Sequence, residues 1–259
     1  MIARKPLYIF IAVQRALFLR ELGMRFSTSK MGLFWTFIEP FMQVLMFVLI
    51  HALVFPTSAS NIDMSVFFAL NFTAYNMFRN ITMKSMGAFR ANHALFIYKQ
   101  VKPIDTIFAR ISVEIFITGI IISLFLLIGL YFDFDINIKN IPMVTVGFIW
   151  LILFSLGMGL ILAISDTYYP SVGKIVNIFM MLLMFGSAIF YSIEMMPTEV
   201  QNFLLINPLT HFMEIIHGSY FYSLDDQFVD YTYILLWTVS YLFGGLWLYR
   251  HLEEKIISL

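Results

Sequence analysis

The chain of 259 residues is 60% hydrophobic and only 12% charged, and it contains no cysteine. One soluble core cannot hide so many apolar side chains, so lipid must cover much of the chain and we expect an integral membrane protein. Disulfides, thiolate metal sites and thiol nucleophiles are excluded. The formal net charge of zero hides a segregation of charge along the chain, and we expect no nucleic-acid partner.

An amphipathic helix is predicted over residues 7–28. Its apolar residues are too interrupted to cross a bilayer, which takes about 20 predominantly apolar residues. One helical face carries the polar residues Gln14, Glu21, Arg25 and Thr28. Arg15 and Arg20 flank this face with stems long enough to snorkel. We expect a helix lying in the cytoplasmic interface, and a plain positive anchor that only sets orientation fits these residues equally well.

Six apolar stretches are predicted to span the membrane as helices, at about 33–55, 66–87, 107–132, 142–165, 175–193 and 231–249. The first contains Glu39-Pro40, a carboxylate beside a helix-bending proline, which should face the protein interior. The third opens with Arg110 and Glu114 at i,i+4, where the two side chains can neutralise each other. In the fourth, Gly157 and Gly159 allow another helix to approach closely.

The second stretch is of poor quality as a span. It carries the polar and charged residues Asn71, Asn76, Arg79, Asn80 and Lys84. A helix of this kind must be sheltered by protein or line a wet path.

The connection over residues 194–230 is the longest, and its apolar runs are too short to cross a bilayer. Asn207-Pro208 has the form of a helix N-cap followed by proline in the first turn. We expect short helices here that are re-entrant or lie on the outer surface. No internal repeat, linker or low-complexity tract divides the chain, so residues 1–259 are predicted to form one all-α membrane domain.

The basic residues indicate the orientation. With both termini in the cytoplasm, every Lys and Arg except Lys139 lies in or beside a cytoplasmic segment. The positive-inside rule therefore predicts this topology. The 194–230 connection, which has acidic residues and no Lys or Arg, is then external.

Two motifs in the sequence have spacings that are close to those of chemical sites. The nearest match to a phosphate-cradling loop is Gly173-Lys174, but Tyr168 stands in place of its first glycine and Ile175 in place of its hydroxyl residue. We therefore expect the chain neither to hydrolyse ATP nor to bind a cofactor. In His211-x-x-Glu214-x-x-His217, steps of three residues drift around a helix and do not gather ligands, so an interfacial helix is favoured over a metal site.

The segment 91–110, between the second and third predicted spans, is amphipathic and basic. The run from Ala94 to Tyr98 puts bulky apolar groups in a place that should be wet, beside Lys99 and Lys102. Exposed apolar side chains ringed by charge usually mark a partner surface. Asp105 is suited to cap the third span after Pro103. A charged cytoplasmic loop that only fixes topology is the alternative.

Aromatic residues make up 18% of the chain, and most are expected to face lipid or pack between helices. A subset near polar residues could instead offer stacking platforms to sugar rings. This subset comprises Trp35, Phe37 and Phe41 around Glu39, Tyr75 near Arg79, and Tyr168 with Tyr169. For any one of them, core packing is the more common role.

Several runs carry a family resemblance: Phe18-Leu19-Arg20-Glu21 with Arg25-Phe26, Gly32 through Trp35 to Glu39-Pro40, Ala91-Asn92 through Leu95-Phe96 and Tyr98 to Val101-Lys102-Pro103-Ile104-Asp105-Thr106, Ala109-Arg110, and Asn207-Pro208-Leu209 with His211 and Glu214. In these runs, which extend from end to end, the chain resembles the membrane subunits of ABC-2 type exporters, specifically the permease of bacterial capsular polysaccharide export.

The resemblance implies a homodimer of six-span subunits joined to two copies of a separate ATPase, in the inner membrane of a Gram-negative bacterium. The ATPase would bind ATP and Mg²⁺. Residues 91–101 would be the coupling helix seated in a cleft of that ATPase. The coupling positions are then Asn92, Leu95, Phe96, Tyr98, Lys99, Lys102 and Asp105. The implied substrate is a lipid-linked polysaccharide, usually acidic, which periplasmic and outer-membrane export proteins would carry onward.

A mechanism follows as a hypothesis. The lipid-linked polymer approaches from the cytoplasmic leaflet, where Arg20 and Arg25 can pair with its phosphate or carboxylate groups. It then threads a path at the dimer interface between the first, second and fifth spans. Closure of the ATPase pushes on residues 92–99, and the adjoining helices transmit the displacement. The candidate path residues are Trp35, Phe37, Glu39, Phe41, Tyr75, Arg79, Tyr168 and Tyr169.

Three alternatives stay open. An exporter of O-antigen or teichoic-acid-like polymer is the nearest. An ion-coupled secondary transporter would normally show broken helices with ionisable groups in two corresponding halves, and Glu39-Pro40 has no counterpart in the later spans. A membrane polysaccharide synthase needs catalytic carboxylates on the cytoplasmic side, where Glu253-Glu254 on the short tail is the only pair.

Overall fold

The computed structural model describes residues 6–27, 32–54 and 62–258, and within these ranges the chain forms helices joined by loops, without a strand. In chain order the helices are α1 (Pro6–Ser27), α2 (Gly32–Val54), α3 (Met64–Met86), α4 (Ala88–Asn92), the 3-10 helix η1 (His93–Ile97), α5 (Pro103–Tyr131), α6 (Ile141–Tyr168), α7 (Val172–Phe185), the 3-10 helix η2 (Ile193–Met195), α8 (Thr198–Leu204), α9 (Pro208–Tyr220) and α10 (Tyr231–Ser258). The all-helical prediction is confirmed for this part of the chain.

Four of the described helices are long and apolar enough to cross a membrane: residues Phe34–Val54 of α2, and all of α5, α6 and α10. Helix α3 has 23 residues but carries the polar side chains expected of the second span. Helix α7 is apolar but has only 14 residues. At 1.5 Å per residue it is about 21 Å long, which is less than the roughly 30 Å of a bilayer core. Six full spans therefore stay a prediction.

The predicted helix at 175–193 is wrong in its second half, because α7 ends at Phe185. The side chains of Asn207 and Thr210 both donate hydrogen bonds to the carbonyl oxygen of Gly186, at 2.9 and 3.0 Å. These bonds satisfy an orphan carbonyl at the helix end while the chain turns. The other predicted spans begin and end within a few residues of α2, α3, α5 and α6, and α10 continues nine residues past its predicted end at Tyr249.

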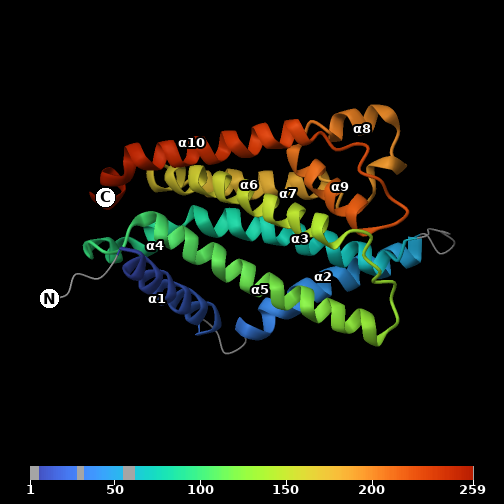
Figure 1. Cartoon of the computed structure of the whole chain (residues 1–259), viewed down its shortest axis with the longest axis horizontal. Coiled ribbons are helices and arrows are strands. Elements are labelled where there is room, and N and C mark those ends of the chain that lie inside the picture. Colours follow the sequence, from blue (N-terminus) through green and yellow to red (C-terminus); the bar gives the residue numbers. More distant parts are fainter. Residues whose placement is uncertain (1–5, 28–31, 55–61, 259) are drawn as a thin grey trace.

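Helix α3 lies at the centre of the bundle, in contact with α2, α5 and α6, and α6 in turn packs against α10 (Figure 1). The largest buried side chains include Phe72, Tyr75 and Phe78 of α3. The predicted close approach at the glycines of α6 is confirmed. A Cβ atom on Gly157 would lie 2.6 Å from the backbone nitrogen of Leu242, and one on Gly159 would lie 2.8 Å from the Cβ of Ser85.

Helix α9 is buried along its length, and every side chain from Leu209 to Tyr220 is shielded. It packs against α6 and α10 rather than lying on the outer surface. Asn207 caps it as predicted, since its Oδ1 accepts the amide of Leu209 at 3.0 Å, and Pro208 occupies the first turn. Helix α8, by contrast, is short and exposes Phe203.

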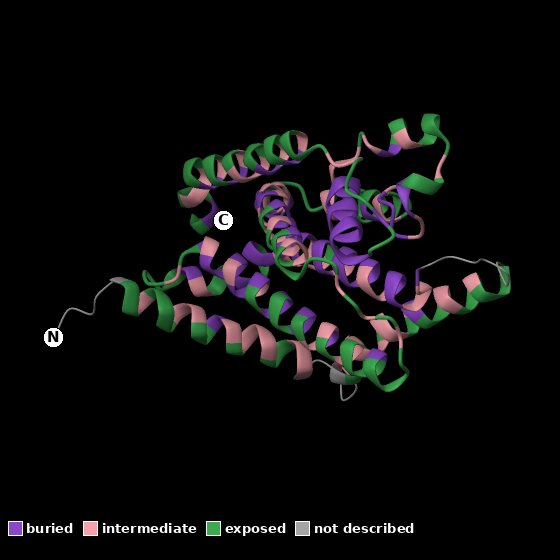
Figure 2. Cartoon of the chain, turned by 45° about the vertical axis from the view of Figure 1, so that its right-hand side comes forward, coloured by how far each residue is buried: buried purple, intermediate pink, exposed green. Residues whose placement is uncertain are grey.

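Burial is concentrated in α3 and α9, whereas α1, α2 and α10 expose much of their surface (Figure 2). The exposed side chains of α2, α7 and α10 are largely apolar, for example Leu49, Leu182 and Phe243. Large exposed apolar surface on long helices is typical of a chain that lipid or a second subunit covers. The start of α1, the end of α10 and α4 lie at the same end of the bundle (Figure 1).

Helix α1 packs against α5, and its polar face is turned toward that helix. The side-chain amide of Gln14 donates to the backbone oxygen of Asp105 at 3.2 Å, and Arg25 ion-pairs with Glu114. The helix itself is confirmed over Pro6–Ser27, while Thr28 lies outside the described residues. Its placement in a membrane interface stays a prediction.

Candidate functional site

The connection between α3 and α5 is a turn at the end of the bundle that holds the start of α1 and the end of α10 (Figure 1). The sequence predicts one helix at 91–101, but the structure has two short ones. Helix α4 ends at Asn92, η1 ends at Ile97, and residues 98–102 are not helical. The chain is extended at Lys102, because a residue before proline disfavours the helical conformation. We call residues 88–102 the α4 turn.

Asp105 caps the amino-terminal end of α5, but from within its first turn, because the helix begins at Pro103 and not at the predicted residue 107. Oδ2 of Asp105 accepts the backbone amide of Lys102 at 2.9 Å, and Pro103 occupies the first helical position. The hydroxyl of Thr106 donates to the carbonyl oxygen of Pro103 at 2.6 Å. The exit from the α4 turn is therefore held in one conformation by local hydrogen bonds.

The predicted coupling residues fall on two sides of the α4 turn. Tyr98, Lys99 and Lys102 are exposed, while Asn92, Phe96 and Asp105 are buried and Leu95 is half-buried. Ile97, which belongs to the apolar run 94–98 but not to the predicted coupling positions, is the most exposed apolar side chain of the turn at 82%, and Tyr98 is 65% exposed. The outer side is thus an apolar pair beside lysines, and the inner side anchors the turn to the bundle.

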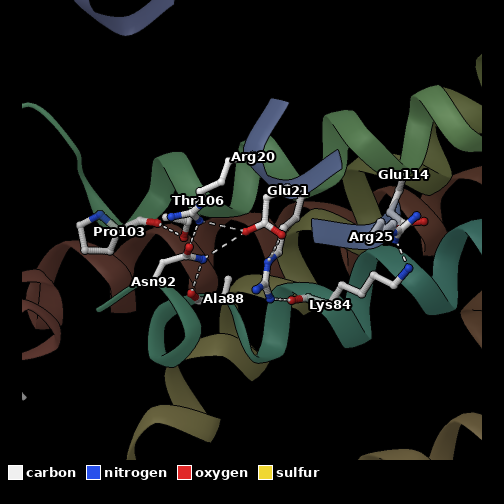
Figure 3. A network of polar contacts seen from close by, with 10 residues as sticks. Arg20, Glu21, Arg25, Lys84, Ala88, Asn92, Pro103, Thr106 and Glu114 are labelled. Carbon is white, nitrogen blue, oxygen red and sulfur yellow. Dashed lines mark hydrogen bonds and ion pairs between the residues drawn. The ribbon is translucent and has the colours of Figure 1, made fainter. Parts of the chain in front are cut away.

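A network of polar contacts lies behind the α4 turn and joins it to α1, α3 and α5 (Figure 3). Arg20 of α1 donates hydrogen bonds to Asn92 and to Glu21, the latter at 3.2 Å. The amide of Asn92 donates to the Ala88 carbonyl oxygen at 2.9 Å. Arg110 of α5 reaches Glu21 at 3.4 Å and also donates to the carbonyl oxygen of Lys84. Charge-assisted bonds therefore tie α1 to the consecutive segments α3, the α4 turn and α5.

Glu114 of α5 is the most deeply buried carboxylate of this network, with 1% of its side chain exposed. It ion-pairs with Arg25 of α1 and with Lys84 of α3, the latter at 2.8 Å. The i,i+4 partner expected from the sequence, Arg110, pairs with Glu21 instead. Burial lowers the pKa of Arg25 to about 10, while the Glu21 carboxylate raises that pKa and the Arg110 charge lowers it. Arg25 stays charged at neutral pH.

A second ion pair ties the α4 turn to the other side of the bundle. Arg90 of α4 donates through Nε to Oδ2 of Asp166 at 2.8 Å, and its Nη2 contacts the same oxygen. Asp166 lies in the last turn of α6 and is buried. On the same side, the ring of Phe89 lies 6.3 Å from that of Tyr249 in α10. A displacement of the turn would therefore also act on α6 and α10, in addition to α3 and α5, which flank the turn in sequence.

A polar cavity of about 360 Å³ lies between α1, α2, α3 and α5. Glu39 and Arg79, both predicted to line the substrate path, contribute to its wall together with Arg25. Among the described residues, none forms a hydrogen bond or ion pair with the Arg79 guanidinium or the Glu39 carboxylate. Both side chains are exposed, so the interior placement predicted for Glu39 is wrong for a single subunit, and within the described part of the chain the cavity offers one cation and one anion whose bonding groups are free.

The aromatic candidates for the path do not gather in one place. Tyr75 is buried, and its hydroxyl donates to the Met180 carbonyl oxygen. Phe37 packs against a small apolar cluster of α5, and the Phe41 ring lies 4.4 Å from that of Phe125. Trp35, Tyr168 and Tyr169 are exposed. Exposed rings at separate places line a common path only if another subunit completes it.

The two histidines of the α9 motif form contacts within the chain. The His217 ring lies 3.0 Å from Oε1 of Glu214 and 2.7 Å from Oδ1 of Asn71. The His211 ring contacts the Leu205 carbonyl oxygen instead. The described residues contain no group of three or more His, Cys, Asp or Glu side chains that could hold a metal ion.

Comparison with known proteins identifies the family to which the chain belongs. The sequence model of the family described as ABC-2 type transporter matches residues 14–221, from α1 to the residue that follows α9. The chain belongs to the ABC-2 type transporter family. The match includes the α4 turn and the network behind it, while α10 lies outside the matched residues.

Members of this family with similar sequences carry names that refer to polysaccharide export. The chain is 33% identical to the polysialic acid transport protein KpsM of Escherichia coli, over 94% of each chain. It is 27% identical to the capsule polysaccharide export inner-membrane protein CtrC of Neisseria meningitidis serogroup A, over 89% of this chain and 87% of that one. It is 26% identical to the capsule polysaccharide export inner-membrane protein BexB of Haemophilus influenzae, over 88% and 85%.

Proposed function

We propose that the chain is the membrane-spanning permease subunit of an ATP-driven exporter that moves lipid-linked capsular polysaccharide across the bacterial inner membrane. The observation that carries this proposal is the similarity, over nine-tenths of the chain, to proteins named for polysialic acid transport and capsule polysaccharide export. The ABC-2 type family supplies the transport class, and the names of the relatives supply the cargo and the inner membrane.

In this proposal both termini and the α4 turn face the cytoplasm. Support comes from the common position of the α4 turn, the start of α1 and the end of α10 at one end of the bundle (Figure 1) and from the positive-inside rule. Lys139, the one basic residue assigned to the opposite face, lies in the loop between α5 and α6, where it pairs with Asp225 at 3.2 Å.

Two copies of a separate ATPase subunit, which bind ATP and Mg²⁺, dock on the α4 turns of a homodimer. The outer side of each turn supplies Ile97, Tyr98, Lys99 and Lys102 as contacts. Asn92, Phe96 and Asp105 act from the inner side by holding the turn against the bundle. A displacement of the turn is transmitted to α1 through the Arg20–Asn92 hydrogen bond and to α6 through the Arg90–Asp166 ion pair.

The polymer passes along the dimer interface, between copies of α2, α3 and α7. This route is supported by the large apolar side chains that α2 and α7 expose within the described part of the subunit. If Arg20 and Arg25 bind the substrate first, the phosphate or carboxylate groups of the substrate must displace Asn92 from Arg20 and Glu114 from Arg25. Arg79 has no such competitor among the described residues, which makes it the better first contact. Periplasmic and outer-membrane export proteins receive the polymer on the far side.

Deletion and complementation in a capsulated host test the function. The deletion strain is expected to keep polysaccharide inside the cell, and the plasmid-borne chain is expected to restore it to the surface. A strain that exports its capsule normally without the chain would contradict the proposal. Accumulation of a different polymer, such as O-antigen, in the deletion strain would contradict the assignment of the cargo.

A further inference from the structure

Two cavities adjoin along the seam between α2, α3 and α5. The larger, of about 710 Å³, is apolar and is bounded by α2, α3, α5, α6 and the chain between α5 and α6. Its wall includes Val48, Phe125, Phe132, Ile138 and Phe148. Its volume falls within the range of roughly 300–1,000 Å³ that is typical of sites for small molecules.

The smaller cavity is the polar one that contains Arg79 and Glu39. Thr73 of α3 lines both cavities, so the two adjoin at that residue. The Thr73 hydroxyl donates to the Ala69 carbonyl oxygen at 2.6 Å, so this junction carries no free donor. The seam as a whole is therefore amphipathic, with a long apolar compartment on one side of Thr73 and a charged compartment on the other.

The charged compartment has an excess of positive charge. Its wall carries the three cations Arg25, Arg79 and Lys84 and the two carboxylates Glu39 and Glu114, a balance of plus one. Arg25 and Lys84 are both paired with Glu114. Arg79 is left as the guanidinium whose donors are free among the described residues. A guanidinium in this setting suits a ligand with one negative phosphate, which it can bind through two parallel hydrogen bonds.

The depth of Arg79 fits the same ligand. It lies seven residues before the end of α3 at Met86, which corresponds to about 10 Å along the helix axis. Headgroup regions occupy roughly the outer 5–8 Å of each leaflet, and an arginine stem can span the remaining distance. The phosphate of a lipid in the leaflet at the α4 end would therefore lie within reach of Arg79.

We propose that the seam binds one singly anionic phospholipid, with its phosphate on Arg79 and an acyl chain in the apolar cavity. The site lies within one subunit, so it does not rest on the export function, on the ATPase or on a dimer. Two sources in the cell have this chemistry: a phospholipid of the bilayer and the lipid end of an exported polymer.

The test is the lipid that stays bound to the purified chain, together with any subunit that co-purifies, after exchange into fresh detergent. Native mass spectrometry of the wild type is expected to show one phospholipid for each chain. Arg79→Gln is expected to lower this retention about tenfold or more, because a hydrogen bond to a charged group is lost. Arg250→Gln, which removes an exposed charge from α10 outside the cavity wall, is the matched control and should retain lipid as the wild type does.

A second variant separates loss of the site from loss of the fold. Ala69→Phe fills the apolar cavity and leaves the guanidinium in place, and it too is expected to lose the lipid. Added phosphatidylglycerol should raise the melting temperature of the wild type and of Arg250→Gln but not that of Arg79→Gln. A wild type that keeps no phosphate-bearing lipid from cells of either kind, or an Arg79→Gln variant that keeps as much as the wild type, would overturn the proposal.

Preparations from cells that make no polymer distinguish the two sources. Phospholipid retained in these cells identifies a bilayer lipid. Retention of a glycan-bearing lipid only in polymer-making cells identifies the lipid end of the cargo. Both results support the site, whereas lipid that is bound in both cells but is independent of Arg79 contradicts it.

Discussion

Arg90 of α4 and Asp166 of α6 form an ion pair that joins the α4 turn to the half of the bundle that does not adjoin it in sequence. Asp166 is 2% exposed, and Arg90 is half-exposed. Because the carboxylate is buried and the guanidinium reaches the surface of the turn, the pair links a surface that a partner can push to a helix in the core.

Neutralising Asp166 is expected to uncouple transport from ATP hydrolysis. In Asp166→Asn the partner ATPase should still bind and hydrolyse ATP, while export for each ATP falls by an amount that corresponds to about 0.5–2 kcal/mol of coupling. The measurement is polymer export and ATPase activity in the same vesicles. The control is Asp225→Asn, which neutralises an exposed carboxylate in the loop before α10. Equal losses of export and hydrolysis would contradict a coupling role for the pair.

Glu114 is expected to be a structural residue of the charged network. Glu114→Gln leaves Arg25 and Lys84 without their carboxylate. Loss of one member of a fully buried pair costs about 3–5 kcal/mol, and the cost here is expected to be smaller because the Arg25 and Lys84 side chains are 18% and 41% exposed. The purified variant should therefore unfold at a lower temperature than the wild type. Glu254→Gln, an exposed carboxylate near the end of α10, serves as the control. A variant at Glu114 with an unchanged melting temperature would show that the network does not hold α1 to α5.

Gly157 is expected to tolerate no larger side chain. A Cβ atom there would lie 2.6 and 2.7 Å from backbone atoms of Leu242 and Tyr241, so Gly157→Val must separate α6 from α10. Overpacking costs about 1–3 kcal/mol where side chains can shift, and backbone atoms yield less easily. The yield of monodisperse protein measures the effect. Gly119→Val is the control, since no atom of the described residues lies within 4 Å of its added Cβ, and equal yields of the two variants would contradict the packing.

The sequence predicted the helices best where the apolar runs were long. The bounds of α2, α3, α5 and α6 follow from apolar length and composition alone. The end of α7 could not be predicted, because it depends on Asn207 and Thr210, which lie more than 20 residues further along the chain. The burial of α9 had the same kind of cause, since His217 finds its partner in Asn71, 146 residues away.

The candidate site was predicted in outline and revised in detail. The α4 turn was found from apolar residues placed among charges, and Asp105 from its spacing to proline. The partners of Glu114 and Arg110 were missed, because i,i+4 spacing indicates a local pair and the structure uses charges of α1 and α3. An acidic residue at the end of an apolar stretch, as at Asp166, was the one available signal for the pair with Arg90.

Co-purification of an ATPase with the chain from native membranes is the most direct test of the central claim. The account predicts that a soluble ATPase subunit accompanies the wild type, and that Ile97→Asp or Tyr98→Asp releases it because an acid replaces an exposed apolar contact. The control is Tyr222→Asp, which changes a tyrosine in the loop after α9 whose exposure is similar to that of Tyr98. This variant should keep the ATPase. Absence of any ATPase from the wild-type preparation, or full retention by both variants of the α4 turn, would contradict the account.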